Sequence, residues 1–444
     1  MTTQIFQAST LYGTATLAAA LDSGCFRPAD RRILLVCNNA ATPETTPGLD
    51  ATPGFERLRD RFDDVVSYNA AIFPFHPGGW APRGDDLPLW ERYLRHEWHL
   101  ADDDVELAVE SIQVNPSLAL AQIFTGAPVT VYADGLMSYG PTRNKIDPLV
   151  GTRVDRVLHL DLVPGLKPLL LTEFGVPGEV LPTPAFTKVL AELASAGDGL
   201  PAIEEPALLL GQYLSALGIL SAEQEEDLHV RMLTGAAGLG HTEVVFKPHP
   251  SAPARFTRSL EKEAERLKVE LTVLDTPVLA EVLYQRMRPA LVVGCFSTAL
   301  LTASALYGLP VARIGTDLLL ERLTPFENSN RVPVTIVDAL LPELGDRAAV
   351  TEQRPGMDVA ALGALVSAVG FAMQPKILPG LRAQTEAHLA KNLNERTLRY
   401  FKRKRLASLA LPGGIPKRLT FVRRNATARR MARRVRALRK AVKR

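Results

Sequence analysis

Short apolar runs that end in glycine or small polar residues recur along the chain, and stretches with a helical pattern separate them. Strands are expected at residues 4–8, 32–36, 105–109, 129–132 and 156–162, and helices at 14–21, 55–62, 89–103 and 118–124. Several of these strands are continuous apolar runs, which are typical of parallel strands buried on both faces. The first part of the chain therefore predicts a doubly wound α/β domain.

A second alternation of the same kind begins at residue 207. It predicts strands at 207–210, 244–246, 271–274, 290–293 and 310–314, and helices at 221–233, 256–267, 278–285 and 297–307. Residues 289–312 carry no charge and are long enough to span a bilayer. Polar, glycine and proline residues interrupt them, however, so two strands flanking a helix explain the segment better.

The sequence thus predicts an α/β fold in which two Rossmann-like domains face each other across a cleft. We expect a first domain at 1–195, a crossover rich in Ala, Gly and Glu at 191–206, and a second domain at 206–375. The last helices of the body are expected at 359–373 and 381–400. A closing helix at 376–401 and a basic tail at 402–444 complete the predicted organisation.

Charge is distributed unevenly along the chain. Of 51 Lys and Arg residues, 17 lie from residue 402 onward, where there is no Asp or Glu, so the first 401 residues carry 34 basic against 48 acidic side chains. Within the tail, apolar residues recur at helical spacing among the arginines, at Ala428, Met431, Val435, Leu438 and Val442. Such a helix is suited to an anionic membrane surface. A solvated, disordered tail and a nucleic-acid-binding tail are the alternatives, and we expect no specific nucleic-acid partner.

Other features narrow the class of protein. The first 21 residues lack the basic start and unbroken apolar stretch of a signal peptide, so we expect a cytoplasmic protein. Cys25, Cys37 and Cys295 are widely spaced among apolar residues, which favours buried thiols over a disulfide or zinc framework. The acidic run at 102–104 is more typical of a solvated loop than of a metal site. No internal repeat or Walker-type phosphate loop is present.

Polar residues follow several strands of the first half. Because the carboxyl ends of parallel strands form the edge at which α/β sheets bind ligands, these residues are candidates for a site. They are Ser9, Thr10, Asn38, Asn39, Asp134 and Gly135, with Asn115 before a helix and Arg143 in the loop after Asp134. Helix capping is the alternative role for the hydroxyls. For Asp134, the alternatives are an ion pair with a nearby basic residue and a base for an acceptor hydroxyl.

In the second half, one strand runs directly into Lys247-Pro248-His249-Pro250. Each proline fixes its own φ and restricts the residue before it, so His249 is held on a rigid turn at a strand's carboxyl end. A turn histidine without any task is the alternative. His76-Pro77 repeats the dipeptide, but no strand leads into it.

Further polar groups are expected at the same edge. Gly211 and Gln212 follow a strand, Glu281 is on a short helix, and Ser297-Thr298 begins a helix after Gly294. Hydroxyls and free N–H groups at a helix N-terminus favour a phosphate, and Lys247 and His249 would complete such a site. Simple helix capping is the alternative for Ser297 and Thr298.

Three motifs occur in a fixed order, namely Ala133-Asp134-Gly135, Lys247-Pro248-His249-Pro250 and Cys295-Phe296-Ser297-Thr298-Ala299-Leu300. Together they resemble the bacterial sialyltransferases of GT-B fold, and most closely the alpha-2,8-polysialyltransferase family, from residue 4 to about residue 400. The resemblance implies a glycosyltransferase that moves sialic acid or a related nonulosonic sugar from a CMP-activated donor to a surface glycan. It also implies inversion at the anomeric carbon, no metal and no cofactor.

The resemblance further implies roles for individual residues. Asp134 is the general base, His249 binds the CMP phosphate and assists its departure, Ser297 and Thr298 bind the same phosphate, and Glu281 holds the ribose or cytosine. Two alternatives stay open. Because a phosphate site does not define the sugar, one is a GT-B enzyme with another donor, such as CMP-Kdo or a CDP-alditol. The family often has an acid where this chain has Ala133, so the other is a non-catalytic protein that binds a nucleotide sugar or polyanion. With the basic tail 402–444, we expect a peripheral protein at the inner face of the membrane.

Overall fold

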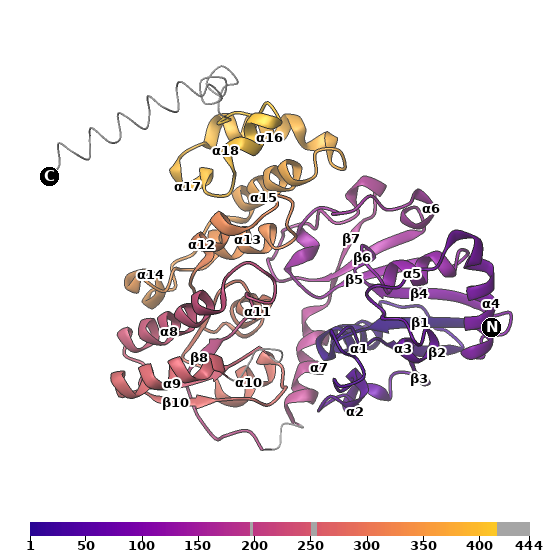
Figure 1. Ribbon diagram of the computed structural model, residues 1–444, viewed down its shortest axis with the longest axis horizontal. Helices are drawn as coiled ribbons and strands as arrows, with labels where there is room; N and C mark the ends of the chain where they lie inside the picture. The colour runs from indigo at the N-terminus through magenta and orange to yellow at the C-terminus, as the bar shows by residue number, and fades with distance from the viewer. Residues whose placement is uncertain (196–198, 250–254, 415–444) are drawn as a thin grey trace.

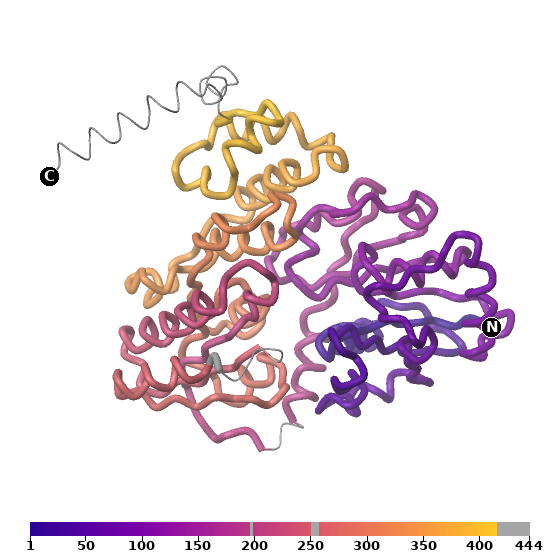
Figure 2. Tube along the Cα trace, viewed as in Figure 1, coloured from indigo at the N-terminus to yellow at the C-terminus, as the bar shows by residue number. Residues whose placement is uncertain are grey.

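The computed structural model describes residues 1–195, 199–249 and 255–414 (Figures 1 and 2). They form two α/β domains, each built on one parallel sheet. The first sheet has the order β3-β2-β1-β4-β5-β6-β7. Its strands are β1 (Thr2–Ala8), β2 (Arg31–Val36), β3 (Asp64–Ser67), β4 (Asp104–Glu110), β5 (Val129–Ala133), β6 (Val154–Leu160) and β7 (Gly178–Leu181).

Seven α-helices accompany this sheet. They are α1 (Leu11–Asp22), α2 (Glu56–Arg59), α3 (Tyr68–Ala71), α4 (Leu87–Glu97), α5 (Ser117–Ile123), α6 (Pro148–Gly151) and α7 (Thr183–Ser195). Short 3₁₀ helices lie at η1 (Leu49–Ala51), η2 (Gly84–Asp86), η3 (Leu136–Tyr139) and η4 (Thr172–Phe174), and η5 (Pro379–Leu381) follows in the second domain.

The second sheet has the order β10-β9-β8-β11-β12. Its strands are β8 (Ala207–Leu210), β9 (Glu243–Lys247), β10 (Glu270–Val273), β11 (Leu291–Gly294) and β12 (Val311–Arg313). The helices that follow β8 are α8 (Ala222–Gly238), α9 (Arg255–Leu267), α10 (Ala280–Met287), α11 (Thr298–Tyr307), α12 (Thr316–Arg322), α13 (Arg331–Leu340), α14 (Arg347–Thr351), α15 (Val359–Met373), α16 (Arg382–Asn392), α17 (Glu395–Leu398) and α18 (Arg403–Ser408).

Each sheet has a topological switch point, where the strand order reverses. The strand order reverses between β1 and β4 in the first sheet and between β8 and β11 in the second. Ligands of doubly wound sheets bind beyond the carboxyl ends of the strands at such a point. Two parallel-sheet domains that face each other in this way have the predicted GT-B arrangement, which the structure confirms.

The uncharged segment at 289–312 folds as predicted into β11, α11 and β12. Every residue of β11 and β12 is buried, which accounts for their apolar composition. Ser297 caps α11, and Gly308 ends it with φ 62°, a conformation that glycine adopts without strain. No helix in the described part of the chain has the length and apolar character needed to cross a bilayer.

Several local predictions were wrong. The helix expected at 89–103 ends at Glu97, because His99 and Ala101 take positive φ values of 53° and 45° before β4 begins. The helix expected at 381–400 is divided into α16 and α17, and Asn394 caps the second. Asn115 was also expected to cap the helix that follows it, but no side-chain cap bond is present at α5.

Helix α7 joins the two domains. It packs against α1 of the first domain and α10 of the second (Figure 1). Its Phe186, Val189 and Leu190 are completely buried in an apolar core that continues through both domains. A second core lies on the other face of the first sheet.

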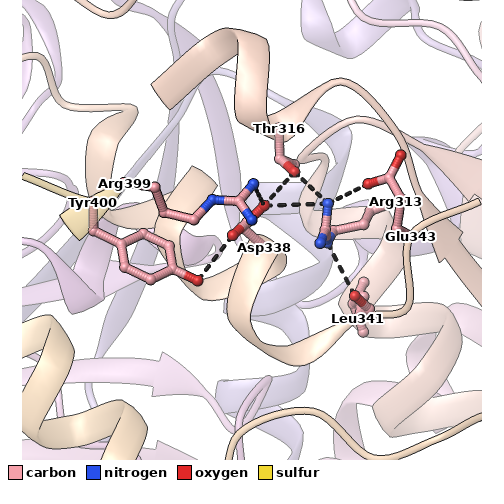
Figure 3. Close-up of polar contacts among 7 residues, drawn as sticks. All are labelled: Arg313, Thr316, Asp338, Leu341, Glu343, Arg399 and Tyr400. Atoms are coloured by element: carbon pink, nitrogen blue, oxygen red, sulfur yellow. Dashed lines mark hydrogen bonds and ion pairs between the residues drawn. The ribbon is translucent and has the colours of Figure 1, made fainter. Parts of the chain in front are cut away.

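The chain after α15 is attached to the second domain through Asp338 of α13 (Figure 3). Arg399 Nη2 and the Tyr400 hydroxyl each donate to this carboxylate over 2.8 Å, and Thr316 Oγ1 donates over 2.6 Å. Arg313 Nη1 lies 3.2 Å from the same carboxylate and also pairs with Glu343. Because Asp338 is 6% exposed, this network is a buried attachment rather than a surface ion pair.

The described beginning of the basic segment also packs on the body. Leu406 and Leu411 are buried, and Lys402 Nζ donates to the carbonyl of Leu323 over 2.7 Å. Residues 402–414 therefore belong to the folded body, although the sequence analysis assigned them to the tail. The predicted amphipathic helix beyond them lies outside the described residues.

Candidate active site

A cleft between the domains has two adjoining lobes. One, of about 740 Å³, is lined by Glu110, Gln113 and Tyr213 and is called the Gln113 lobe; the other, of about 700 Å³, is lined by Lys247 and Glu281 and is called the Lys247 lobe. Six residues line both lobes: Asp134, Gly135, Gly211, His249, Ser297 and Thr298. The residues predicted for catalysis and phosphate binding thus come together where the lobes meet.

Asp134 lies directly beyond β5, which Tyr132 fixes by donating to the carbonyl of Gln7 over 2.9 Å. Its carboxylate lies against the first turn of α1, where a Cβ added to Gly13 would be 3.6 Å from Oδ2. Burial, followed by the charge of Glu110, raises the pKa of Asp134 to about 7. A carboxyl group with this pKa is half ionised near neutral pH, which suits a general base.

Glu110 was missed in the sequence analysis. It ends β4 opposite Tyr132 of β5, and its side chain lines the Gln113 lobe together with Asp134. Ser9 Oγ donates to its Oε2 over 2.5 Å, whereas burial raises the pKa of the Glu110 carboxyl. The rule that selected Asp134, a polar residue directly after an apolar strand, would also have selected Glu110.

The two domains approach each other closely beside Asp134. A Cβ added to Gly135 would lie 3.1 Å from Thr298 Oγ1 of the opposite domain. Glycine fits here, whereas a residue with a side chain would displace Thr298. Ser297 caps α11 by accepting from the N–H of Ala299 over 3.2 Å, which leaves its own hydroxyl proton available to a ligand. The preceding loop is held by Gln212 Oε1, which accepts from the N–H of Phe296 over 2.8 Å.

Lys247 and His249 enter the cleft from the end of β9. The N–H of Gly211 donates to the Lys247 carbonyl over 2.9 Å, and the His249 ring lies 6.4 Å from that of Tyr213. The imidazole is exposed to the cleft, yet the protein around it and the charge of Lys247 lower the pKa of His249. A neutral imidazole can donate one N–H to an anion. Pro250 lies outside the described residues.

Glu281 differs from the other candidates because it is almost completely buried. It is 3% exposed, and Thr302 Oγ1 donates to its Oε1 over 2.6 Å. Burial raises the pKa of the Glu281 carboxyl, while the hydrogen bond from Thr302 and the charge of Lys247 oppose this rise. It nevertheless lines the Lys247 lobe, at the start of α10.

Tyr12 is a second residue that the sequence analysis missed. It lines the Lys247 lobe, and its ring packs edge-on against Phe186 with centroids 5.4 Å apart. Its hydroxyl is buried and has no hydrogen-bond partner among the described residues. Burial and the charge of Glu281 raise the pKa of Tyr12. This first-domain phenol lines the same lobe as Glu281 of the second domain.

The first-domain candidates divide into two groups. Ser9, Thr10, Asn38 and Asn39 line the Lys247 lobe. Thr10 also caps α1, as the alternative for such residues predicted. Asn115 and Arg143 line neither lobe; the N–H of Arg143 donates to Gln113 Oε1 over 2.6 Å, behind the wall of the Gln113 lobe. In the described part of the chain, no group of three or more His, Cys, Asp or Glu residues is arranged to hold a metal ion.

A family model described as alpha-2,8-polysialyltransferase matches residues 4–316, which include all three motifs. The chain belongs to the alpha-2,8-polysialyltransferase family. It is therefore a glycosyltransferase whose family uses a nucleotide-sugar donor and a glycan acceptor, as predicted. No curated protein matches the sequence.

Solved structures with a similar course of chain include a GT-B domain of a sialyltransferase from Photobacterium damselae, at a TM-score of 0.41 and 12% identity over 76% of this chain and 96% of that one. A UDP-GlcNAc 2-epimerase from Methanocaldococcus jannaschii matches with a TM-score of 0.43 and 13% identity, over 70% of this chain and 83% of that one. MurG from Acinetobacter baumannii matches with a TM-score of 0.40 and 12% identity, over 87% of this chain and 95% of that one. At these scores the similarities add nothing to the assignment, which rests on the family and on the topology of the sheets.

Proposed function

We propose that this polysialyltransferase-family protein transfers sialic acid or a related nonulosonic sugar from a CMP-activated donor to a glycan hydroxyl, with inversion and without a metal or cofactor. The observation that carries the proposal is the position of Asp134, His249, Ser297 and Thr298 at the junction of the two lobes. Direct displacement requires that a base and a phosphate site both lie beside the same anomeric carbon.

Each side chain would have one task. Asp134 accepts the proton of the acceptor hydroxyl while its oxygen attacks the anomeric carbon. CMP departs with the bonding electrons, and the developing phosphate charge is stabilised by the Ser297 and Thr298 hydroxyls, the N-terminus of α11 and a His249 N–H. Because burial and the charge of Lys247 lower the pKa of His249, we assign it hydrogen bonding to the phosphate ahead of proton donation.

The walls of the Lys247 lobe suggest where the substrates bind. Its second-domain wall carries Lys247 and Glu281, which suits CMP, with the carboxylate directed at ribose or cytosine. Its first-domain wall carries Ser9 and Asn38, which suits an acceptor glycan. This assignment keeps donor and acceptor on opposite domains.

Calorimetric titration with CMP, UDP and GDP, together with a CMP-release assay on CMP-sialic acid, tests the proposal. Asp134→Asn is expected to bind CMP normally and to lose transfer by about 10²- to 10⁴-fold, because only the base is removed. His249→Ala should weaken both CMP binding and transfer. Tight UDP binding without CMP binding, or full transfer by Asp134→Asn, would overturn the proposal.

We also propose that the basic segment 402–444 holds the enzyme on an anionic membrane surface, with each basic side chain near the surface contributing about 1 kcal/mol. Since residues 402–414 pack on the body, the truncation should begin at residue 415. We expect the truncated protein to lose flotation with anionic liposomes. Unchanged flotation contradicts the membrane proposal, as does salt-dependent binding of the full chain to DNA in a gel-shift assay without flotation.

A further inference from the structure

One surface of the first domain exposes large apolar side chains. Phe73 is 77% and Phe75 is 51% exposed in the loop after α3, and Leu89 is 57% exposed on α4. Trp80 stacks on Phe75 with ring centroids 6.2 Å apart, and Trp80 and Trp90 pack against the core, which joins the loop to the helix. Phe73, Phe75 and Leu89 are here called the apolar face. Exposed apolar side chains gathered in one place mark an interaction surface.

Exposed acids border the apolar face. Glu44 and Asp50 line a hollow of about 300 Å³ together with Phe73 and Phe75. Asp85 lies in η2, directly before α4. All three acids are exposed, and none of them forms an ion pair with a described residue. Their carboxylates can therefore pair with a basic partner.

The acidic excess of the body is concentrated in the same part of the chain. Residues 41–104 carry 13 acidic and 6 basic side chains, whereas the rest of the first 414 residues carries 35 acidic against 32 basic. Arg92, an exposed base on α4, lines a separate hollow with Glu91 and Asp102. A basic segment with apolar side chains is the partner that complements the charge and the surface of the apolar face.

Residues 415–444 of the same chain have these properties. They include 13 Lys and Arg and no Asp or Glu, and apolar residues such as Met431, Val435 and Leu438 recur among them at helical spacing. Thirty residues span up to about 100 Å when extended, whereas a compact body of this size is on the order of 60 Å across. The segment can therefore reach the apolar face from residue 414. Its attachment also gives it a higher effective concentration there than the same segment of a second copy.

We propose that residues 415–444 bind the apolar face of their own chain when no anionic membrane is present. The apolar residues of the segment then cover the apolar face, and its arginines pair with the flanking acids. The same side chains would contact a membrane surface, so the two associations exclude each other. The segment thus exchanges between the body and the membrane. This proposal does not depend on the transfer chemistry.

Photo-cross-linking of the full chain tests the proposal, with p-benzoylphenylalanine in place of Leu438. Intramolecular adducts should map to residues 41–104. The double variant Phe73→Ser/Phe75→Ser should lower their yield about three- to tenfold, because it removes the apolar surface that the segment covers. Leu149→Ser is the matched control, since Leu149 is 78% exposed on α6 of the same domain, and it should leave the yield unchanged.

A second variant, Glu44→Gln/Asp50→Asn/Asp85→Asn, separates charge from apolar contact. It should also lower the yield, and it should weaken the dependence of the yield on salt. Vesicles of phosphatidylglycerol should suppress the adducts, whereas vesicles of phosphatidylcholine should not. Adducts on another surface, adducts with the mass of two chains, or equal yields in both variants and the control would overturn the proposal. So would an undiminished yield on phosphatidylglycerol vesicles to which the protein is bound.

Discussion

Replacing Glu110 with Gln should shift the pH dependence of transfer to lower pH. Glu110 raises the pKa of Asp134 through its negative charge, although burial is the larger cause. Gln has nearly the same shape and retains a carbonyl oxygen that can accept from Ser9 Oγ. The substitution therefore removes a charge from the wall of the Gln113 lobe while preserving its packing.

The size of the effect follows from the pKa of Asp134, about 7. At about pH 6 only about one tenth of the carboxyl groups is ionised, so lowering the pKa can raise kcat/KM by up to about tenfold. At about pH 7, where half is ionised, the gain cannot exceed about twofold. Because burial remains, the observed gains should fall below these limits.

The assay is the initial rate of CMP release across the acid limb of the pH profile, at substrate concentrations well below KM. Glu395→Gln, an exposed carboxyl on α17 remote from the cleft, is the control and should leave the profile unchanged. An acid limb that stays in place in Glu110→Gln, or moves to higher pH, would refute the electrostatic coupling of these two carboxylates.

Three further outcomes are expected. Asp134→Asn should raise Tm more at about pH 8 than at about pH 5: the folded pKa of about 7 lies above the reference value of 3.8, so the cost of the buried carboxyl to stability grows as pH rises from 3.8 to about 7 and is complete above it. An equal change in Tm at both pH values contradicts this. Gly135→Ala should lower transfer, since its Cβ would crowd Thr298, whereas Gly126→Ala, with open space around it, should not. Asp338→Ala should cost about 3 kcal/mol in denaturant unfolding, because it removes the buried acceptor shared by Arg313, Thr316, Arg399 and Tyr400; a loss below about 1 kcal/mol is the contrary result.

Much of the site was predictable because one rule of sheet geometry places it. Asp134, His249 and Ser297 are far apart in sequence, but each lies shortly after the end of an apolar strand, and the carboxyl ends of parallel strands share one edge. The same rule also points to Glu110, the last residue of β4, although by sequence alone such an acid resembles a solvated one. Only the pairing of β4 with β5 brings it beside Asp134.

The elements that escaped prediction lack an independent periodic signal. Strand β7 is exposed over most of its length and is held by its pairing with β6. Helix α13, at Arg331–Leu340, contains Pro333 and β-branched residues that disfavour a helix. Tertiary packing overrides this, because the helix is buried and Arg331 donates to the carbonyls of Phe326 and Leu323.

Helix α7 limits how this enzyme can be recombined with its relatives. It follows the last strand of the first sheet, yet Phe186 and its buried neighbours fill space against both α1 and α10. In a chimaera whose second domain is exchanged at residue 196, the native α7 would pack against a foreign α10. Their side chains would not match in shape, so the continuous core would contain cavities or clashes. Exchange of the second domain should therefore carry α7 as part of the transplanted unit, with the junction placed before Thr183 and compensating changes made on α1.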